Sequence, residues 1–400
     1  MAHTDDHIFE WVHEHIHDDV NRLLLKYGKD PALRYAILQI DCRKRASAKL
    51  GLTLQCPRFR FPTLLSAEQA TSDALAKFHS SLIAPGSDVI DMTCGLGIDT
   101  FAMARHCRSV TACEINREIA ETASANATAL GLHNVNIINC DSTEFLQTPS
   151  LNADVIFADP ARRGQGGKRL FALADCSPDV SVLLDRMLDI APTVIIKASP
   201  MLDVSHTIHE LRRVKRIIAT GTSRECKELI AVCHRDHTNS PAYESVTLNG
   251  YDTISHFTFS ETEESECATT YSSPQRGHFI YEPYPAVMKM APFRSLCQRY
   301  NIPKCDPDSH LYLSAQAIEG FPGKGFGVRE VFPFSKQGIR DLSRITDRYD
   351  ITARNFPLTA PELAKKLKSQ SSTCQRLFAT TAMGRRLLIL TEPLVNTDCR

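Results

Sequence analysis

The segment 88–100 constrains the fold more than any other part of the chain, because it combines a strand, a glycine turn and the start of a helix. Val89–Ile90 is an apolar, β-branched pair, Gly95 and Gly97 form a Gly-x-Gly turn, and a helix-like run follows over 101–105. In α/β folds, a strand that feeds such a turn presents backbone N–H groups to a ligand. The segment therefore predicts an α/β fold with a binding site at this turn.

Acidic residues follow the same order as the predicted strands. Asp91 precedes the turn, Glu114 ends the second strand, and Asp141 and Asp159 follow the third and fourth. The carboxyl ends of parallel strands meet at one edge of a sheet, where ligands bind. A carboxylate at Glu114 is placed to accept hydrogen bonds from both ribose hydroxyls, and Asp141 from an adenine amino group. The ordered set predicts a nucleoside cofactor.

Two features separate this site from a dinucleotide site. Thr100 stands where the third glycine or alanine of the dinucleotide pattern is expected, and Asp91 would lie close to the phosphates. A carboxylate there suits a cationic or amino-acid-bearing ligand better than a pyrophosphate. An alternative stays open, in which the acids only cap helices, above all Asp141 before Ser142.

This arrangement resembles that of class I S-adenosylmethionine-dependent methyltransferases over residues 87–235. The resemblance implies a Rossmann-like sheet and S-adenosyl-L-methionine as cofactor. The candidate cofactor-binding residues are Asp91, Thr93, Gly95, Gly97, Glu114, Asp141 and Asp159.

A second motif, Asp159-Pro160, ends a buried-strand pattern over 154–158. Many methyltransferases of nucleobases carry Asp or Asn followed by two prolines and an aromatic or Arg here, and the motif holds the target nitrogen against the methyl sulfonium. Methyl transfer is an in-line displacement, so positioning supplies most of the catalysis. Ala161 replaces the second proline and Arg162 replaces the aromatic that would stack on a flipped base, which leaves base recognition open.

Lys197 ends the fifth predicted strand and is a candidate for orienting the substrate or Asp159. Enzymes that make 5-methyluridine carry a nucleophilic Cys after this strand, whereas this chain continues with 198–200, Ala-Ser-Pro. Cys226 lies one strand later between basic residues that can lower its pKa, but a structural role is the stronger expectation. The candidate catalytic residues are Asp159, Pro160, Arg162 and Lys197.

A glycine-rich basic loop, Arg162–Arg169, follows the Asp-Pro motif, and it either contacts phosphates or is simply solvated. His13 and His17 formally match the His-Glu-x-x-His zinc pattern, with both residues on one helix face. No third ligand stands out, so we expect a solvated helix and no metal.

Hydrophobic periodicity predicts the elements along the chain. Helices are expected at 7–27, 32–50 and 69–83, the last after a capping box at Ser66–Gln69. Strands are expected at 89–91, 109–113, 135–139, 154–158, 193–197, 216–219 and 229–233, with helices at 117–130 and 179–190. Such alternation predicts a parallel sheet covered on both faces. The strand at 229–233 follows its neighbour too closely for a crossover and should be antiparallel.

The rest of the chain has a different pattern. A hairpin is expected over 243–259, a linker over 260–276, and a small α+β region beyond 279. That region should contain a helix at 285–300, strands at 324–334 and 351–356, a helix at 360–367 and a terminal hairpin from 377–381 and 386–390.

Bulk composition excludes several classes of protein. Of the 400 residues, 43% are hydrophobic and 23% charged, as in soluble globular proteins. No apolar run reaches the roughly 18 residues of a membrane span, and the polar N-terminus does not resemble a secretory signal. Fourteen cysteines without a Cys-x-x-Cys pair indicate free thiols in a reducing cytoplasm. We therefore expect a cytoplasmic protein of two or three domains.

Charge is balanced overall but uneven along the chain: residues 335–400 hold twelve Lys and Arg against six Asp and Glu. Aromatic and basic residues also alternate there, as in Phe334, Lys336, Arg340, Arg354 and Phe356. Such alternation suits base stacking and phosphate contact with RNA. A core strand with a basic exposed face is the equally open alternative.

Taken whole, the chain resembles a bacterial family of class I methyltransferases with a ferredoxin-like insert and a C-terminal THUMP-like domain. The matching stretches are Asp159–Arg163, Asp175–Asp179, Lys197–Asp203, Glu225–Leu229, Tyr281–Pro283, Ser309–Tyr312 and Arg354–Leu358. The domains implied are a helical region 1–85, a methyltransferase domain 86–260, a ferredoxin-like domain 277–320 and a THUMP-like domain 321–400.

THUMP domains in other enzymes bind RNA, so the resemblance implies methyl transfer to a base nitrogen of a structured RNA, tRNA or rRNA. Methylation of a protein or small molecule, and an RNA-binding module with a vestigial cofactor fold, remain as alternatives.

Overall fold

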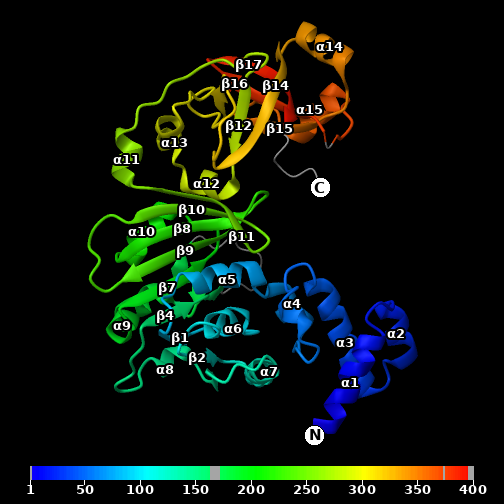
Figure 1. Ribbon diagram of the computed structural model, residues 1–400, viewed down its shortest axis with the longest axis vertical. Helices are drawn as coiled ribbons and strands as arrows, with labels where there is room; N and C mark the ends of the chain where they lie inside the picture. Colours follow the sequence, from blue (N-terminus) through cyan, green and yellow to red (C-terminus); the bar gives the residue numbers. More distant parts are fainter. Residues whose placement is uncertain (1, 163–171, 373, 395–400) are drawn as a thin grey trace. The chain divides into compact units, whose positions relative to one another are not determined.

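The computed structural model describes residues 2–162, 172–372 and 374–394 (Figure 1). The chain forms two compact units. The first comprises Met1–Ile217, Glu228–Asn239 and Gly250–Asp252, and the second Ile218–Lys227, Ser240–Asn249 and Thr253–Arg400.

A nine-stranded sheet has the order β11-β10-β8-β9-β7-β4-β1-β2-β3. Its strands are β1 (Asp88–Asp91), β2 (Ser109–Glu114), β3 (Val135–Asn139), β4 (Val155–Ala158), β7 (Thr193–Ala198), β8 (Val214–Thr222), β9 (Cys226–His234), β10 (Ala242–Asn249) and β11 (Asp252–Phe259). Strands β7, β4, β1, β2 and β3 are mutually parallel, whereas β9 is antiparallel to β7, as its short connection predicts. The predicted Rossmann-like α/β class is confirmed.

Strand order reverses beside β1. The chain moves from β1 to β2 and β3 on one side, then returns to place β4 and β7 on the other. The carboxyl ends of β1 and β4 therefore bound a topological switch point, where ligands of open α/β sheets bind. The helices that follow these strands are α6 (Ile98–Ala104), α7 (Arg117–Ala129), α8 (Ser142–Phe145), α9 (Val180–Ile190) and α10 (Val204–Leu211).

The N-terminal helices differ from the expected pattern. The predicted helix 7–27 is two helices, α1 (Ala2–Glu14) and α2 (Val20–Tyr27), because the Asp19 side chain accepts the Arg22 N–H and starts a new helix. α3 (Pro31–Ala46) confirms the helix predicted at 32–50, but it ends at Ala46. The proposed capping box at Ser66–Gln69 is wrong, because Ser66 lies inside α4 (Leu64–Gln69) and Ser72 caps α5 (Asp73–Ser81).

The N-terminal helices share a hydrophobic core with the helices that follow β1 and β2. Phe59 and Phe61, on the segment after α3, pack in an edge-to-face pair, and Phe59 also meets Phe101 of α6. Ala123 and Ala127 of α7 belong to the same buried cluster. The packing places the junction of α4 and α5 beside the β1–α6 turn.

The turn between β1 and α6 requires glycine. Gly95 has φ +54° and Gly97 has φ +92°, and Gly97 is the N-cap residue of α6. A Cβ on Gly97 would lie 2.4 Å from the Phe101 ring. Position 97 therefore requires glycine for two reasons, its left-handed backbone conformation and its close packing against Phe101.

The second unit contains a six-stranded sheet of order β13-β12-β14-β17-β16-β15. Its strands are β12 (Phe279–Pro283), β13 (Tyr312–Ser314), β14 (Gly323–Pro333), β15 (Asp350–Arg354), β16 (Arg376–Ala382) and β17 (Arg385–Pro393), and its helices include α14 (Lys336–Ile345) and α15 (Ala360–Leu367). The terminal hairpin β16–β17 is antiparallel, as predicted. The helix α14 was not predicted.

Two expectations for this unit are wrong. The predicted linker contains a helix, α11 (Glu261–Glu266), because Ser260 caps it and Glu263 pairs with Arg299. The predicted helix 285–300 is divided into α12 (Pro285–Met290) and α13 (Phe293–Tyr300), because Ala291 has φ +59° and a proline follows.

We expect Gly97→Ala to lower the free energy of unfolding by about 2–4 kcal/mol, since it combines left-handed strain with a ring clash. Gly131→Ala is the matched control. Gly131 has φ +70°, but no atom lies within 4 Å of the position that its added Cβ would occupy, so only strain of about 1 kcal/mol is expected. Denaturant titration measures both. Equal losses would show that the Phe101 ring yields freely.

Candidate functional site

A cavity of about 1150 Å³ lies at the carboxyl ends of β1, β2, β3 and β4. Of the predicted cofactor residues, those that line it are Thr93, Gly95, Gly97, Glu114, Asp141 and Asp159. The α4–α5 region contributes Ser66, Gln69, Ala70 and Thr71. No sequence pattern assigns these four to the site, because their approach depends on tertiary packing of the N-terminal helices.

Glu114 is locked to the glycine turn. Its Oε2 accepts the Gly95 N–H at 2.9 Å, and its Oε1 accepts the Asn116 N–H at 2.8 Å. Each carboxylate oxygen keeps further acceptor capacity. The side chain is therefore fixed in place while it can still accept hydroxyl donors from the cavity.

Asp91 is placed differently from the cofactor contact expected of it. Its side chain is buried and does not line the cavity. It accepts the Thr93 N–H at 2.9 Å and the Thr100 hydroxyl at 2.6 Å. Burial raises the pKa of Asp91 to about 7, against the effect of these two hydrogen bonds. The observed contacts hold the turn against the start of α6.

Asp141 is both a helix cap and a cavity residue. Its Oδ1 accepts the Thr143 N–H at 2.8 Å and the Thr143 hydroxyl at 2.7 Å, and it caps α8. It also lines the cavity. The capping alternative and a ligand-binding role are thus compatible, because both cap bonds use one oxygen.

Asp159 joins the two strands at the switch point. Its backbone N–H donates to Thr93 Oγ1 at 2.7 Å, and its Oδ2 lies 2.7 Å from Lys197 Nζ. The Asp159 side chain is 41% exposed, whereas that of Lys197 is 9% exposed. The carboxylate therefore faces the cavity and the ammonium supports it from behind.

The other candidates near this motif lie as follows. Pro160 and Lys197 line a second cavity of about 70 Å³. Arg162 ends β5 (Ala161–Arg162), which pairs with β6 (Cys176–Ser177). The rest of the basic loop, including Arg163, Lys168 and Arg169, lies outside the described residues.

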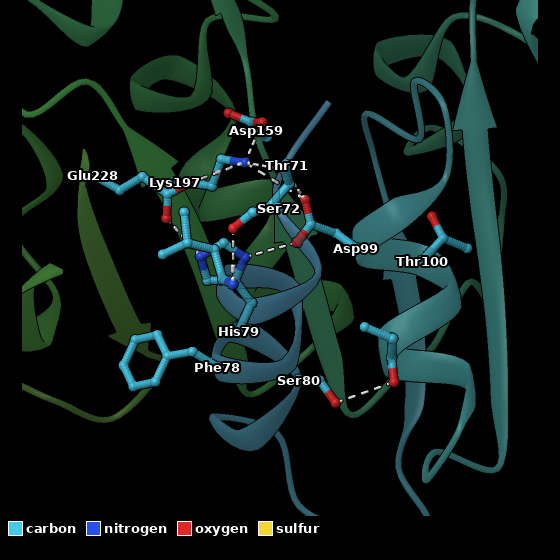
Figure 2. A network of polar contacts seen from close by, with 12 residues as sticks. Thr71, Ser72, Phe78, His79, Ser80, Asp99, Thr100, Asp159, Lys197 and Glu228 are labelled. Carbon is cyan, nitrogen blue, oxygen red and sulfur yellow. Dashed lines mark hydrogen bonds and ion pairs between the residues drawn. The ribbon is translucent and has the colours of Figure 1, made fainter. Parts of the chain in front are cut away.

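Behind Asp159 lies a cluster of ionisable side chains (Figure 2). His79 of α5 is fully buried; its Nδ1 lies 2.7 Å from Asp99 Oδ1, and its Nε2 lies 2.7 Å from Glu228 Oε2. Lys197 Nζ donates to Thr71 Oγ1 at 2.7 Å. The Lys197 ammonium also lies 3.5 Å from Asp99 and 3.6 Å from Glu228.

Opposite charges determine the direction of the pKa shifts of His79 and Asp99, whereas burial determines that of Asp159. Burial alone would lower the pKa of His79, but Glu228 and Asp99 outweigh it and raise the pKa to about 9. Burial would raise the pKa of Asp99, but Lys197 and His79 hold it well below its usual range. Burial raises the pKa of Asp159, with Lys197 opposing the shift.

Sequence reasoning missed four members of this cluster: Thr71, His79, Asp99 and Glu228. Asp99 lies within the opening motif and Glu228 within a stretch that carries the family resemblance, but no spacing relates them to a histidine on α5. Only the tertiary structure brings them together.

Two weaker motifs find no place at this site. α1 ends at Glu14, so the expected helix face shared by His13 and His17 does not form. Cys226 begins β9, where its Sγ lies 3.7 Å from the Thr220 carbonyl oxygen, and it is not among the lining residues of the described cavity.

In the second unit the alternating aromatics are packed inward. Phe332 is buried in a cluster with Leu342 and Leu388, and Phe334 and Phe356 pack against the same cluster in an edge-to-face pair. Their basic neighbours Lys336 and Arg340 are exposed. The structure therefore has a core strand with a basic exposed surface.

Comparisons with known proteins identify a domain family for each of three parts of the chain. Residues 89–161 match the methyltransferase domain family, 279–322 a ferredoxin-like domain and 323–393 a THUMP-like domain. A solved structure from Porphyromonas gingivalis W83, described as a candidate methyltransferase, is 28% identical, with a TM-score of 0.87 over 96% of this chain and 97% of that one.

Curated relatives agree in class. An uncharacterized S-adenosylmethionine-dependent methyltransferase of Mycobacterium tuberculosis is 25% identical over 82% of this chain and 87% of its own length. The 23S rRNA (uracil(747)-C(5))-methyltransferase RlmC of Vibrio vulnificus is 34% identical over 19% of this chain and 20% of its own length.

Fold, cavity and these matches define the class: the chain is an S-adenosylmethionine-dependent methyltransferase. It carries a ferredoxin-like and a THUMP-like domain after the methyltransferase domain, which confirms the predicted architecture. Within the described residues, no helix is long and apolar enough to cross a membrane.

We expect the His79 ion pairs to make stability depend on pH. The pKa of His79 is raised from 6.5 to about 9 on folding, so its stabilisation is full below pH 6.5 and is lost as pH rises to about 9, an effect of about 3 kcal/mol. The stability difference between wild type and His79→Gln should shrink over this interval in thermal melts. A difference independent of pH would contradict the assignment.

Proposed function

We propose that this methyltransferase transfers a methyl group to a base nitrogen of a structured RNA, tRNA or rRNA. The observation that carries the proposal is the Asp159 carboxylate, which faces the cavity that it shares with Glu114, Asp141 and the glycine turn. Three carboxylates at fixed positions along one sheet edge suit a ligand with hydroxyl and amino donors.

The residues present fit S-adenosyl-L-methionine. Glu114 would accept hydrogen bonds from the two ribose hydroxyls, and Asp141 would accept one from the adenine amino group. Gly95 and Gly97 would let the backbone approach the amino-acid part closely. Asp91 would act indirectly, by holding the turn through Thr93 and Thr100.

When bound, the cofactor supplies a methyl group made electrophilic by its sulfonium. Asp159 would accept a hydrogen bond from the target N–H and so aim the nitrogen lone pair at the methyl carbon; as the N–C bond forms and the methyl–sulfur bond breaks, the carboxylate would be placed to take the N–H proton. Lys197, 2.7 Å away, would hold the carboxylate in that direction. Positioning of this kind accounts for most of the acceleration in an in-line displacement.

A nitrogen target is favoured over carbon. β7 ends at Ala198 and continues into Ser199 and Pro200, so a nucleophilic Cys is absent there. The cysteines Cys94, Cys113 and Cys140 line the cavity, and burial raises the pKa of the first two above the usual value of a thiol. Those two thiols are therefore not disposed to attack a base.

An RNA acceptor is supported by the second unit and by the relatives. The THUMP-like domain has a basic exposed surface, and RlmC, as its name says, methylates 23S rRNA. Because the aromatic residues Phe332, Phe334 and Phe356 pack inward, we assign RNA contact there to phosphates rather than to base stacking. Methylation of a protein or small molecule is the competing outcome.

We expect Asp159→Ala to reduce methyl transfer at least 100-fold while cofactor affinity stays within about threefold, because in the proposed mechanism the carboxylate contacts the target and not the ribose. Glu114→Gln should instead weaken binding of S-adenosylhomocysteine about 10- to 100-fold, as a charged hydrogen-bond acceptor is lost. Calorimetry and transfer of tritiated methyl to total RNA measure the two effects. Normal turnover by Asp159→Ala would contradict the role assigned to Asp159.

We expect RNA binding to weaken steeply with salt. Lys336→Glu with Arg340→Glu, one turn apart on α14, should weaken the gel shift of total tRNA and reduce its salt slope by about two. Arg108→Glu is the control, since exposed Arg108 precedes β2 at the opposite strand ends. Equal effects of both variants, or methyl incorporation that survives RNase, would argue against an RNA acceptor.

A further inference from the structure

The cluster behind Asp159 contains three carboxylates and two cationic groups. Asp99, Glu228 and Asp159 are the acids, and Lys197 and His79 are the bases (Figure 2). With His79 protonated, the net formal charge of the five side chains is −1. A neutral His79 would make it −2.

With Asp99 and Glu228 ionised, as the lowered pKa of each carboxyl group indicates, the hydrogen-bond geometry makes His79 cationic. Each ring nitrogen lies 2.7 Å from a carboxylate oxygen, of Asp99 on one side and of Glu228 on the other. An ionised carboxylate can only accept, so both nitrogens must donate, and an imidazole ring donates twice only as imidazolium.

The contacts divide the acids between the two cations. His79 lies 2.7 Å from both Asp99 and Glu228. Lys197 lies farther from these two acids, at 3.5 Å and 3.6 Å, and is closest to Asp159, at 2.7 Å. Thr71 completes the arrangement by donating to Asp99 Oδ2 at 2.7 Å and accepting from Lys197.

We propose that His79 is a positioning residue for methyl transfer. By pairing with Asp99 and Glu228, it keeps these two acids from competing for Lys197, so that the Lys197 ammonium stays paired with Asp159. This inference rests on the proposed role of Asp159 in the methyltransferase reaction. Without the imidazolium, the buried carboxylates of Asp99 and Glu228 lose their nearest cation and draw Lys197 toward themselves. Asp159 then loses its partner and becomes easier to protonate, and a protonated acid no longer accepts from the target N–H.

The surroundings of His79 contain few competing charges. Among the described residues that face it, the charged groups are Asp99 from α6, Glu228 from β9 and, through them, Lys197 from β7. The ring of Phe157 on β4 lies 5.9 Å away by ring centroids and is apolar. The charge state of His79 is therefore determined by the same two carboxylates that compete for Lys197.

Charge-compensating variants test the proposal. His79→Gln makes the cluster −2, whereas His79→Gln with Glu228→Gln returns it to −1 without restoring the ring. We expect His79→Gln to lower kcat at least tenfold with cofactor affinity unchanged, and the double variant to recover most of that loss. His106→Gln, at a histidine that contacts Ser80 outside the cluster, is the matched control and should behave as wild type.

Nuclear magnetic resonance supplies readouts that do not depend on the acceptor. In the full chain, imidazole ¹⁵N shifts should show His79 protonated on both nitrogens at pH 7.5, with titration near pH 9. The carboxyl ¹³C signal of Asp159 can be identified by its absence in Asp159→Asn. Its titration midpoint should lie at least one pH unit higher in His79→Gln than in wild type, and it should return to the wild-type value in the double variant.

The outcomes separate the two proposals. A neutral His79 at pH 7.5, or an Asp159 titration unchanged by His79→Gln, overturns the positioning role. Loss of activity that the double variant does not recover assigns His79 to structure alone. If the titrations behave as expected but total RNA accepts no methyl group, the RNA proposal fails while the link from His79 to Asp159 stands.

Discussion

The hydrogen bond between the Asp159 N–H and Thr93 Oγ1 is the contact on which the site depends, because it joins the two strands at which the sheet order reverses. Asp91 supports it from beneath by accepting the Thr93 N–H and the Thr100 hydroxyl. A displaced Thr93 would move the glycine turn and the Asp-Pro motif together. The halves of the cavity assigned to cofactor and acceptor are therefore held in register by a few short bonds.

The sequence predicted what local pattern determines. Alternating strands and helices, the antiparallel β9 and the hairpin β16–β17 follow from periodicity and connection length, and the acids at strand ends could be placed because parallel strands share one edge. Predictions failed where a cap or a left-handed residue divided an apolar run: Asp19 divides one helix, Ala291 another, and Ser72 begins a helix that Ser66 was expected to begin.

The remainder of the site depends on contacts between distant segments. Thr71 reaches Lys197 across 126 positions and His79 reaches Glu228 across 149. No periodicity encodes such pairs, and His79 alone is typical of an ordinary core histidine on an amphipathic helix. The N-terminal helices enter the site for the same reason: Phe59 and Phe61 anchor them on α6 and α7, which carries the α4–α5 junction to the cavity wall.

A buried charge cluster is a poor way to gain stability, because desolvation offsets much of the attraction and apolar replacements often serve as well. Its value here lies in its one exposed member. The side chains of His79, Asp99, Lys197 and Glu228 are each at most 11% exposed, whereas that of Asp159 is 41% exposed. Four buried groups thus surround the fifth, and under the proposed mechanism, in which catalysis depends on positioning, a fixed carboxylate matters more than the energy that apolar packing would supply.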